Sequence, residues 1–257
     1  MMYGICNLSS VPCRKEPSDA SEMVTQLLFG EHYQIIEEQE RWTYIRIIHD
    51  NYLCWISRNQ VHYISDAFAE AISYSTARSI VSDILSLVQH NNDITSVVLG
   101  SSLPYYRAGS FNIEQQEYEY GGEVSTSKGA RTDIVNFAMN YLNTPYLWGG
   151  RSPFGIDCSG LTQVCYKLAN KQLPRDAYQQ ADLGVSLSFV EEAQAGDLAF
   201  FDNADGRIIH VGIMTGEGTI IHASGKVKID PIDHFGIYDV AQKKYSHRLR
   251  LLKSYLL

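Results

Sequence analysis

The strongest constraint on the fold of this chain is a change in hydrophobic pattern near residue 130. Before it, residues 1–65 carry short runs such as HYQIIEE and WTYIRII, separated by turn residues at Gly30-Glu31 and Asp50-Asn51. Alternation of apolar and polar residues with a period of two is typical of half-buried strands. Because no apolar segment of helix length appears, we predict a small β-barrel over residues 1–65.

A second β-rich region is predicted over residues 66–127. Residues 66–75 have Phe68, Ala71 and Ile72 at helical spacing, so we expect a short connecting helix there. Beyond it, β-branched and aromatic runs such as ITSVVLG and EYEYGGEV favour strands. The run SIVSDILSLV fits either a helix or a strand, and the composition of the region favours a strand. Strand spacing alone suggests a degenerate copy of the first barrel.

The pattern changes after the polar stretch STSKGAR, which resembles a linker. TDIVNFAMNYLN (132–143) and CSGLTQVCYKLAN (158–170) place apolar residues at helical spacing, and Thr132 is suited to the N-cap of the first segment. A Gly/Pro loop joins them, and the strand-like segments LAFFD, IIHVGIMT and GTIIHAS follow. Residues 128–257 are therefore predicted to form an α+β domain.

Cys158 follows the Gly-rich loop and stands at the head of the second predicted helix. A helix N-terminus favours negative charge, so it stabilises a thiolate, and its N–H groups can donate to an oxyanion. Asp157 and Ser159 are suited to capping this helix. The alternative is that Cys158 is a small buried hydrophobic residue, which is the commoner fate of a free cysteine. We expect that fate for Cys165, on the same predicted helix face.

A cysteine nucleophile needs a base, and the base needs an orienting group. His210 lies in IIHVGIM and His222 in TIIHAS, and the Gly-Glu-Gly sequence between these runs suits a hairpin turn. With the turn centred on Glu217, residue 212 faces residue 222, so the two histidines are diagonal neighbours on one face. A change of register by one residue would separate them. The sequence therefore predicts Cys158 as nucleophile and His210 as base, with His222 within reach of His210.

Taken singly, each of these histidines is equally compatible with a surface residue or a satisfied core residue. Two histidines and a cysteine are also zinc ligands by type. No fourth ligand is obvious, and no pair has the short spacing of a structural zinc site, so we expect neither a metal nor another cofactor. The remaining histidines lie in polar or turn contexts and are expected at the surface: His32, His49, His62, His90, His234 and His247.

Composition restricts the partners of the chain. Lys and Arg total 21 against 29 Asp and Glu, a formal charge of −8, which argues against binding to nucleic acid or to an anionic membrane. No apolar run reaches the roughly 18 residues of a membrane span, and the first residues do not have the pattern of a signal peptide. The scattered cysteines fit a reducing compartment, and we expect Cys6, Cys13 and Cys54 to be structural. We therefore expect a cytoplasmic monomer, or a periplasmic one if a signal peptide has been removed.

The motifs PYLWGG, IDCSGL, AGDLAFF, IIHVGIM and IIHAS occur here in one order. With this order, residues 128–245 resemble the NlpC-type cell-wall cysteine peptidases. The resemblance implies a compact papain-like fold in which Cys158 is the nucleophile, His210 the base and His222 the group that orients the base. It also implies that Tyr146 hydrogen-bonds near the nucleophile and helps to form the oxyanion site.

The pattern of VPCRKEPSDASEMVTQLLFGE and NYLCWIS resembles a bacterial SH3-like barrel. Two such barrels before an NlpC-type domain resemble the γ-D-glutamyl-L-diamino acid endopeptidases, in which the barrel restricts the cleft to peptides with a free N-terminal L-Ala. This resemblance implies that Glu31 and Tyr52 meet the substrate ammonium, and that Asp176 and Ser159 are further substrate contacts. A buried ammonium does need carboxylate partners. By base rate, however, Glu31 is a surface acid.

The expected fold class is thus α+β, a papain-like NlpC-type domain preceded by two small SH3-like barrels. The expected reaction is hydrolysis of the bond between γ-D-Glu and the diamino acid, meso-diaminopimelate or L-lysine, in small murein peptides. Two alternatives stay open. The chain could be an endopeptidase that acts on intact peptidoglycan, with the barrels as wall anchors, or a non-catalytic module that binds wall peptides.

Overall fold

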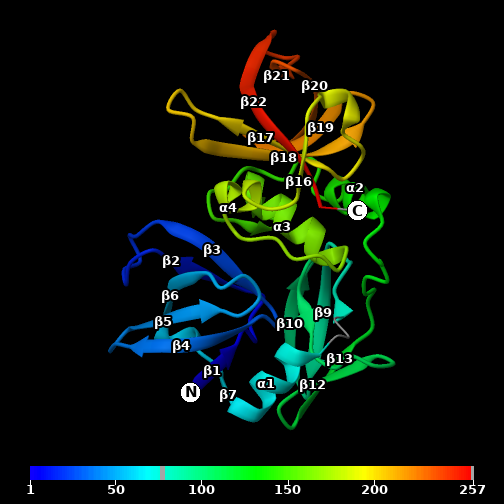
Figure 1. Ribbon diagram of the computed structural model, residues 1–257. Helices are drawn as coiled ribbons and strands as arrows, with labels where there is room; N and C mark the ends of the chain where they lie inside the picture. The colour runs from blue at the N-terminus through cyan, green and yellow to red at the C-terminus, as the bar shows by residue number, and fades with distance from the viewer. Residues whose placement is uncertain (76–78, 256–257) are drawn as a thin grey trace. The chain divides into compact units, whose positions relative to one another are not determined.

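The computed structural model describes residues 1–75 and 79–255, so residues 76–78, at the predicted start of the second β-rich region, lie outside the described residues. The chain divides into two compact units, drawn in Figure 1. The first unit contains Met1–Thr126 and Trp148–Pro153, and the second contains Ser127–Leu147 and Phe154–Leu257. Within the described residues, no helix has both the length and the apolar composition needed to cross a bilayer.

The first unit begins with a seven-stranded antiparallel sheet in the order β3-β2-β6-β5-β4-β1-β7. Side chains from β3 and from β4, four places further along this order, such as Leu27 and Tyr33, are buried in one core. The sheet therefore curls into the predicted SH3-like barrel. Its strands are β1 (Met2–Ile5), β2 (Ser10–Arg14), β3 (Met23–Leu28), β4 (His32–Glu38), β5 (Trp42–Ile47), β6 (Leu53–Ser57) and β7 (Tyr63–Ile64), with a short 3-10 helix at Arg58–Gln60 before β7.

The second part of this unit consists of a helix and two small sheets. The predicted connecting helix is α1 (Asp66–Tyr74), and Ser65 caps it by accepting a hydrogen bond from the amide of Phe68. The sheets have the orders β10-β9-β13-β12 and β11-β8, and SIVSDILSLV contributes strands, as composition favoured. The strands are β8 (Ser79–Ile80), β9 (Leu85–His90), β10 (Asp93–Val98), β11 (Ser102–Leu103), β12 (Ser110–Ile113) and β13 (Gln116–Tyr120).

The two parts of the first unit share a hydrophobic core. Phe29, at the end of β3, packs edge-on against Phe111 and Tyr118 of the second part. The next residue, Gly30, has φ +77°, and a Cβ there would lie 1.8 Å from the carbonyl oxygen of Ser102. This position therefore accepts only glycine, because both the backbone conformation and the space exclude a side chain.

The second unit is built on a sheet in the order β16-β22-β17-β18-β19-β20-β21, with an additional pairing of β21 and β22 that closes it. The helices α2, α3 and α4 all contact β18, and Figure 1 shows them on one side of the sheet. The elements are α2 (Arg131–Met139), β15 (Gly155–Ile156), α3 (Cys158–Leu168), α4 (Ala177–Ala181), β16 (Val185–Leu187), η2 (Val190–Glu192), β17 (Leu198–Asp202), β18 (Ile208–Gly216), β19 (Thr219–Ser224), β20 (Lys226–Asp233), β21 (Gly236–Asp239) and β22 (Lys244–Ser254). The short β14 (Arg151–Ser152) belongs to the first unit.

The start of α2 differs from the prediction. The helix begins at Arg131, so its N-cap is Ala130 and not Thr132, and no side chain caps it. Thr132 lies inside the first turn, where its hydroxyl cannot take the N-cap position. The helix start is held instead by Arg131, whose guanidinium donates to Asp197 at 2.6 Å.

Candidate active site

Cys158 is the first residue of α3 and is 7% exposed. The N-cap is Asp157, as predicted, and its side chain accepts a hydrogen bond from the amide of Gly160 at 2.7 Å. The helix begins here because Asp157 satisfies one of the amides that the first turn leaves without a helical partner. This arrangement places the thiol at the positive end of a buried helix.

The thiol of Cys158 contacts the backbone of strand β18. The ladder between β18 and β19 runs from the turn as far as the pair Gly212 and His222, and beyond it β19 continues only with β20. The amide of Val211, which follows His210, hydrogen-bonds to the thiol of Cys158. Cys158 is therefore held at the residue that follows its predicted base in strand β18.

The register predicted for the two histidines is confirmed. Gly212 pairs with His222 across the β18–β19 hairpin, which makes His210 and His222 diagonal neighbours. Their rings are buried, and Nε2 of His210 lies 2.9 Å from Nδ1 of His222. Since Nε2 of His210 is engaged in this way, a proton from the thiol has to be accepted at Nδ1.

Asp230 extends this chain of contacts, and the sequence analysis did not identify it. Its Oδ2 lies 3.0 Å from Nε2 of His222 and 2.9 Å from the ammonium of Lys228. On the β19–β20 hairpin, His222 pairs with Lys228, so Asp230 is the diagonal neighbour of His222. The tight turn at Gly225 was the signal that could have revealed it, by the same parity that related the two histidines.

His247 was expected at the surface, and that expectation is wrong. Its ring stacks on His210 with the centroids 4.1 Å apart and the planes at 21°. Strand β22 brings it there, because Ile237 of β21 pairs with His247 where the sheet closes. Burial, together with the charges on His222 and Lys228, lowers the pKa of His247 to about 4, so it is neutral near neutral pH.

His49 was also expected at the surface, and its side chain is instead only 16% exposed. Its Nε2 lies 3.3 Å from the guanidinium of Arg151, a contact within the first unit. The barrel therefore buries a polar group that the sequence pattern did not identify.

Among residues 1–75 and 79–255, three imidazoles form a group that could hold a metal ion. One ligand atom each from His210, His222 and His247 lies within 4.8 Å of the others. However, the rings of His210 and His247 are nearly parallel, so the lone pairs in their planes do not converge on one point. Chelation would also require breaking the contact between His210 and His222. The geometry thus suits a pair of hydrogen-bonded imidazoles, with His247 stacked on His210, better than a metal centre.

Burial has opposite effects on the nucleophile and the base. It raises the pKa of Cys158 to about 12, helped by the charge of Asp157 and opposed by the Val211 amide and Arg175. It lowers the pKa of His210 well below the usual value, and the charges of neighbouring groups, His247 first, lower it further. Both shifts favour the uncharged forms, a thiol and a neutral imidazole.

Arg175 is a second residue that the sequence analysis missed. It is 1% exposed, and its guanidinium donates to Asp157 at 2.6 Å and to the Ser159 hydroxyl at 2.8 Å. Ser159 is thus held against Asp157 and Arg175 in the second unit. The next residue, Asp176, is the N-cap of α4 and forms a capping box with Gln179.

Tyr146 lies near the nucleophile, as the resemblance implied. Burial raises the pKa of its hydroxyl, and the charges of Cys158 and Asp157 raise it further. Its backbone is fixed by a hydrogen bond from its amide to Gly225 and by a bridge to Ile156. The hydroxyl therefore stays protonated and can donate a hydrogen bond.

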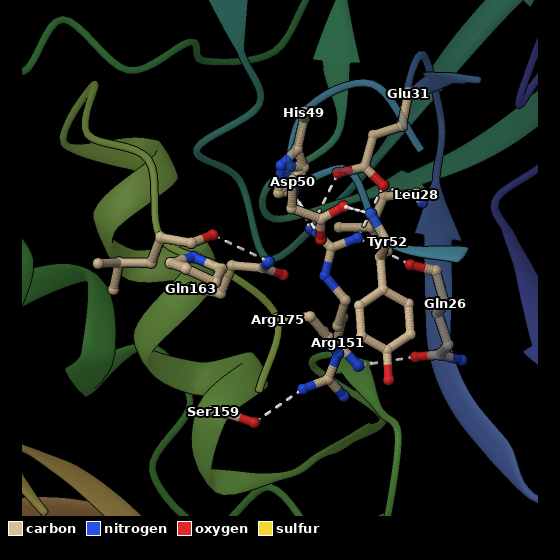
Figure 2. Close-up of polar contacts among 12 residues, drawn as sticks. Gln26, Leu28, Glu31, His49, Asp50, Tyr52, Arg151, Ser159, Gln163 and Arg175 are labelled. Atoms are coloured by element: carbon tan, nitrogen blue, oxygen red, sulfur yellow. Dashed lines mark hydrogen bonds and ion pairs between the residues drawn. The ribbon is translucent and has the colours of Figure 1, made fainter. Parts of the chain in front are cut away.

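Glu31 belongs to the first unit and is buried, only 3% exposed, unlike an ordinary surface acid. Both of its carboxylate oxygens accept from the guanidinium of Arg151, at 2.7 and 2.9 Å, and Oε2 also accepts from the amide of Leu28 at 2.9 Å. Figure 2 shows Arg151 between Glu31 and Gln26, whose carbonyl accepts from it at 2.7 Å. Nearby, Tyr52 packs against the barrel core.

Comparisons with known proteins agree with this fold. Residues 143–247 match the NlpC/P60 family, and residues 13–61 match the bacterial dipeptidyl-peptidase Sh3 domain. The chain therefore combines an NlpC/P60 domain with an N-terminal bacterial SH3 domain. NlpC/P60 is a family of cysteine peptidases.

The chain is similar along most of its length to two dipeptidyl-peptidases. It is 29% identical over 248 residues to dipeptidyl-peptidase 6 of Lysinibacillus sphaericus, covering 85% of this chain and 87% of the relative. It is 27% identical over 245 residues to a gamma-D-glutamyl-L-lysine dipeptidyl-peptidase of Bacillus cereus, covering 84% and 72%. A crystal structure of an NlpC/P60 family protein from Bacillus cereus has the same fold, with a TM-score of 0.80 and 21% identity over 99% of this chain and all of that one.

Proposed function

We propose that this protein is a cysteine peptidase that cleaves murein peptides between γ-D-Glu and the diamino acid, and that it requires a free N-terminal L-Ala. Two observations support the proposal: the Cys158 thiol is hydrogen-bonded to the amide of Val211, the residue after His210, and His210 contacts His222, which in turn contacts Asp230. The combination of an NlpC/P60 domain with the SH3 domain, and the names of the similar proteins, support the choice of bond.

The first half of the reaction forms a thioester. The sulfur of Cys158 attacks the γ-carbonyl carbon of D-Glu while its proton passes to Nδ1 of His210. The N–H groups at the start of α3 and the hydroxyl of Tyr146 then stabilise the oxyanion. As the C–N bond breaks, the imidazolium of His210 returns its proton to the amine of the leaving diamino acid.

The second half regenerates the enzyme. Water attacks the thioester carbon, His210 accepts a proton from that water, and the C–S bond breaks to release L-Ala-D-Glu and the thiol. No redox or external reactant besides water is needed. Because the pKa of Cys158 is raised and that of His210 is lowered, each proton transfer accompanies bond making or breaking and does not precede it.

Selectivity for the free amine is proposed to involve Glu31 and Tyr52, with Ser159 and Asp176 as further contacts. The acidic net charge of −8 fits a cationic amine as ligand. We also propose a monomer in the cytoplasm, where the five free cysteines would stay reduced.

The test is mass spectrometry of L-Ala-γ-D-Glu-L-Lys and of its meso-diaminopimelate counterpart after incubation with the full chain. Wild type should release L-Ala-D-Glu, and Cys158→Ala should release none. Cys165→Ala is the matched control, since Cys165 is a buried thiol of the same helix. The control should retain cleavage.

Two further measurements separate the proposal from its alternatives. N-acetylation of the tripeptide should prevent cleavage, because it removes the ammonium. Undiminished cleavage of the acetylated peptide would remove the amine requirement, and turnover by Cys158→Ala would overturn the mechanism. Release of soluble peptides from purified sacculi, without turnover of the tripeptide, would favour an endopeptidase of intact wall.

A further inference from the structure

Three buried side chains on adjacent strands repeat one diagonal step. His210 on β18 contacts His222 on β19, and His222 contacts Asp230 on β20, at 2.9 and 3.0 Å. In each hairpin the two partners are offset by two residues from the directly paired position. All three residues are at most 6% exposed. Such short contacts away from water require each donor to face an acceptor.

The charged end of this chain dictates where the protons lie. An ionised carboxylate only accepts hydrogen bonds, so Nε2 of His222 must carry the hydrogen that points to Asp230. In neutral His222, Nδ1 is then a lone pair and accepts from Nε2–H of His210. Neutral His210 consequently has its own lone pair at Nδ1, the nitrogen left to take the proton of Cys158.

We propose that Asp230 is a positioning residue that sets the tautomers of His222 and His210 and so keeps Nδ1 of His210 as the proton acceptor. The proposal rests on the proposed function insofar as Cys158 is the group that gives up the proton. Asp230 itself touches neither the thiol nor the reacting atoms. It acts through two imidazoles, and the opposite tautomers would set a lone pair of His222 against its carboxylate oxygen.

Other charged and titratable groups face this chain from neighbouring strands. Lys228 donates to Asp230 at 2.9 Å and to Asp239 at 2.8 Å, which keeps an ammonium beside the carboxylate. His247 stacks on His210 from β22. Burial lowers the pKa of His222, and the hydrogen bond with Asp230 offsets part of that lowering. Asp230 is the member of this group that contacts His222 directly, whereas Asp239 contacts Lys228.

This difference supplies a matched pair of variants. Asp230→Asn keeps the size of the side chain but removes the charge. Lys228 then attracts the amide oxygen, so the amide NH₂ faces His222 and reverses both tautomers, which leaves an N–H of His210 pointing at the thiol. Asp239→Asn removes a charge from the same ammonium and keeps the hydrogen bond between Asp230 and His222.

The experiment measures three quantities on the full-length protein. They are kcat/KM for the tripeptide, the rate of Cys158 alkylation by iodoacetamide across pH, and the histidine tautomers from long-range ¹H–¹⁵N spectra. We expect D230N to lower both rates by about 10- to 100-fold, the range typical of groups that orient a functional imidazole through a hydrogen bond. The D239N variant should stay within about threefold of wild type.

The spectra should show His222 of the wild type as the Nε2–H tautomer and His222 of D230N as the Nδ1–H tautomer. A wild-type His222 that carries its hydrogen on Nδ1 would overturn the proposal without any variant. Equal rates for D230N and wild type would overturn it as well. If D230N unfolds, Asp230→Glu replaces it: this variant keeps an ionised acceptor and should keep the Nε2–H tautomer.

Alkylation separates this proposal from the proposed function. If the tripeptide is not cleaved by the wild type, yet D230N slows alkylation of Cys158, the substrate assignment fails and the role of Asp230 stands. If the wild type cleaves the tripeptide and D230N affects neither rate, the peptidase assignment stands and the role of Asp230 fails.

Discussion

The buried ion pair between Glu31 and Arg151 should be a large stabilising contact of the first unit. Arg151 is fully buried, and its guanidinium donates to both oxygens of Glu31 and to the carbonyl of Gln26. Replacing either residue takes the ion-pair partner away from a charge that stays buried. We therefore expect Glu31→Gln and Arg151→Met each to destabilise the unit, although neither residue contributes to the apolar core.

The contacts set the size of the effect. Glu31→Gln removes the negative charge and leaves one acceptor oxygen where the guanidinium now donates to two. Breaking one partner of a buried pair typically costs about 3–5 kcal/mol, and we expect a loss of this size. The double variant E31Q/R151M removes both members of this pair and should cost less than the sum of the two single variants. We expect a coupling free energy of at least about 3 kcal/mol.

The chain contains its own probe for this measurement. Its three tryptophans, Trp42, Trp55 and Trp148, all belong to the first unit, so tryptophan fluorescence during urea unfolding reports on that unit. Lys15→Gln is the control, because the pair of Lys15 with Glu22 is exposed and 3.5 Å long. Such a surface pair should contribute less than about 1 kcal/mol.

Additive losses of unfolding free energy in the single and double variants would contradict this prediction. If the double variant costs the sum of the single variants, Glu31 and Arg151 are not energetically coupled. The same series clarifies the proposed role of Glu31 in substrate binding. Because E31Q is expected to loosen the barrel, its loss of activity alone is no proof of an ammonium contact, and the folded double variant is the fairer comparison.

Two further predictions concern the second unit. Arg175→Met should slow alkylation of Cys158 near neutral pH, because the charge of Arg175 lowers the pKa of the thiol; an unchanged rate would show that this charge does not reach the sulfur. The second prediction is that acid weakens the unit between about pH 6.5 and 4. The pKa of His247 is about 4 in the folded protein against 6.5 ordinarily, so the unfolded chain binds more protons in that window, and stability falls as pH decreases through it. His247→Phe keeps an aromatic ring beside His210 but cannot titrate. Calorimetry should show that the variant loses this share of the pH dependence of stability, about 1–2 kcal/mol after allowance for partial exposure. An unaltered pH dependence of stability would contradict this prediction.

Local patterns in the sequence were sufficient to place Cys158 at a helix start and to pair His210 with His222. Period-two alternation identified the strands of the barrel, and helical spacing placed Cys158 at the start of a helix. The short turn around Glu217 fixes the register of its hairpin, because few residues link the two strands. The diagonal contact of His210 with His222 therefore followed from parity alone.

The contact of Asp230 with His222 could be predicted from hairpin register in the same way. The β19–β20 hairpin turns at Gly225, and its register follows from that turn as directly as the first hairpin does from Glu217. The sequence alone does not indicate that His222 needs a partner on a third strand. The structure does, because burial of His222 makes a partner for its second nitrogen necessary.

Contacts between distant segments were decided by the tertiary structure alone. His247 reaches His210 only because β21 and β22 pair and close the sheet, and no local turn sets that closure. Arg151 pairs with Glu31 across 120 residues of sequence. By itself, the sequence determined where the reacting side chains sit on their own elements. The closed sheet decided their neighbours, and hence the directions of their pKa shifts, because desolvation depends on what packs around a group and not on the residues beside it in the chain.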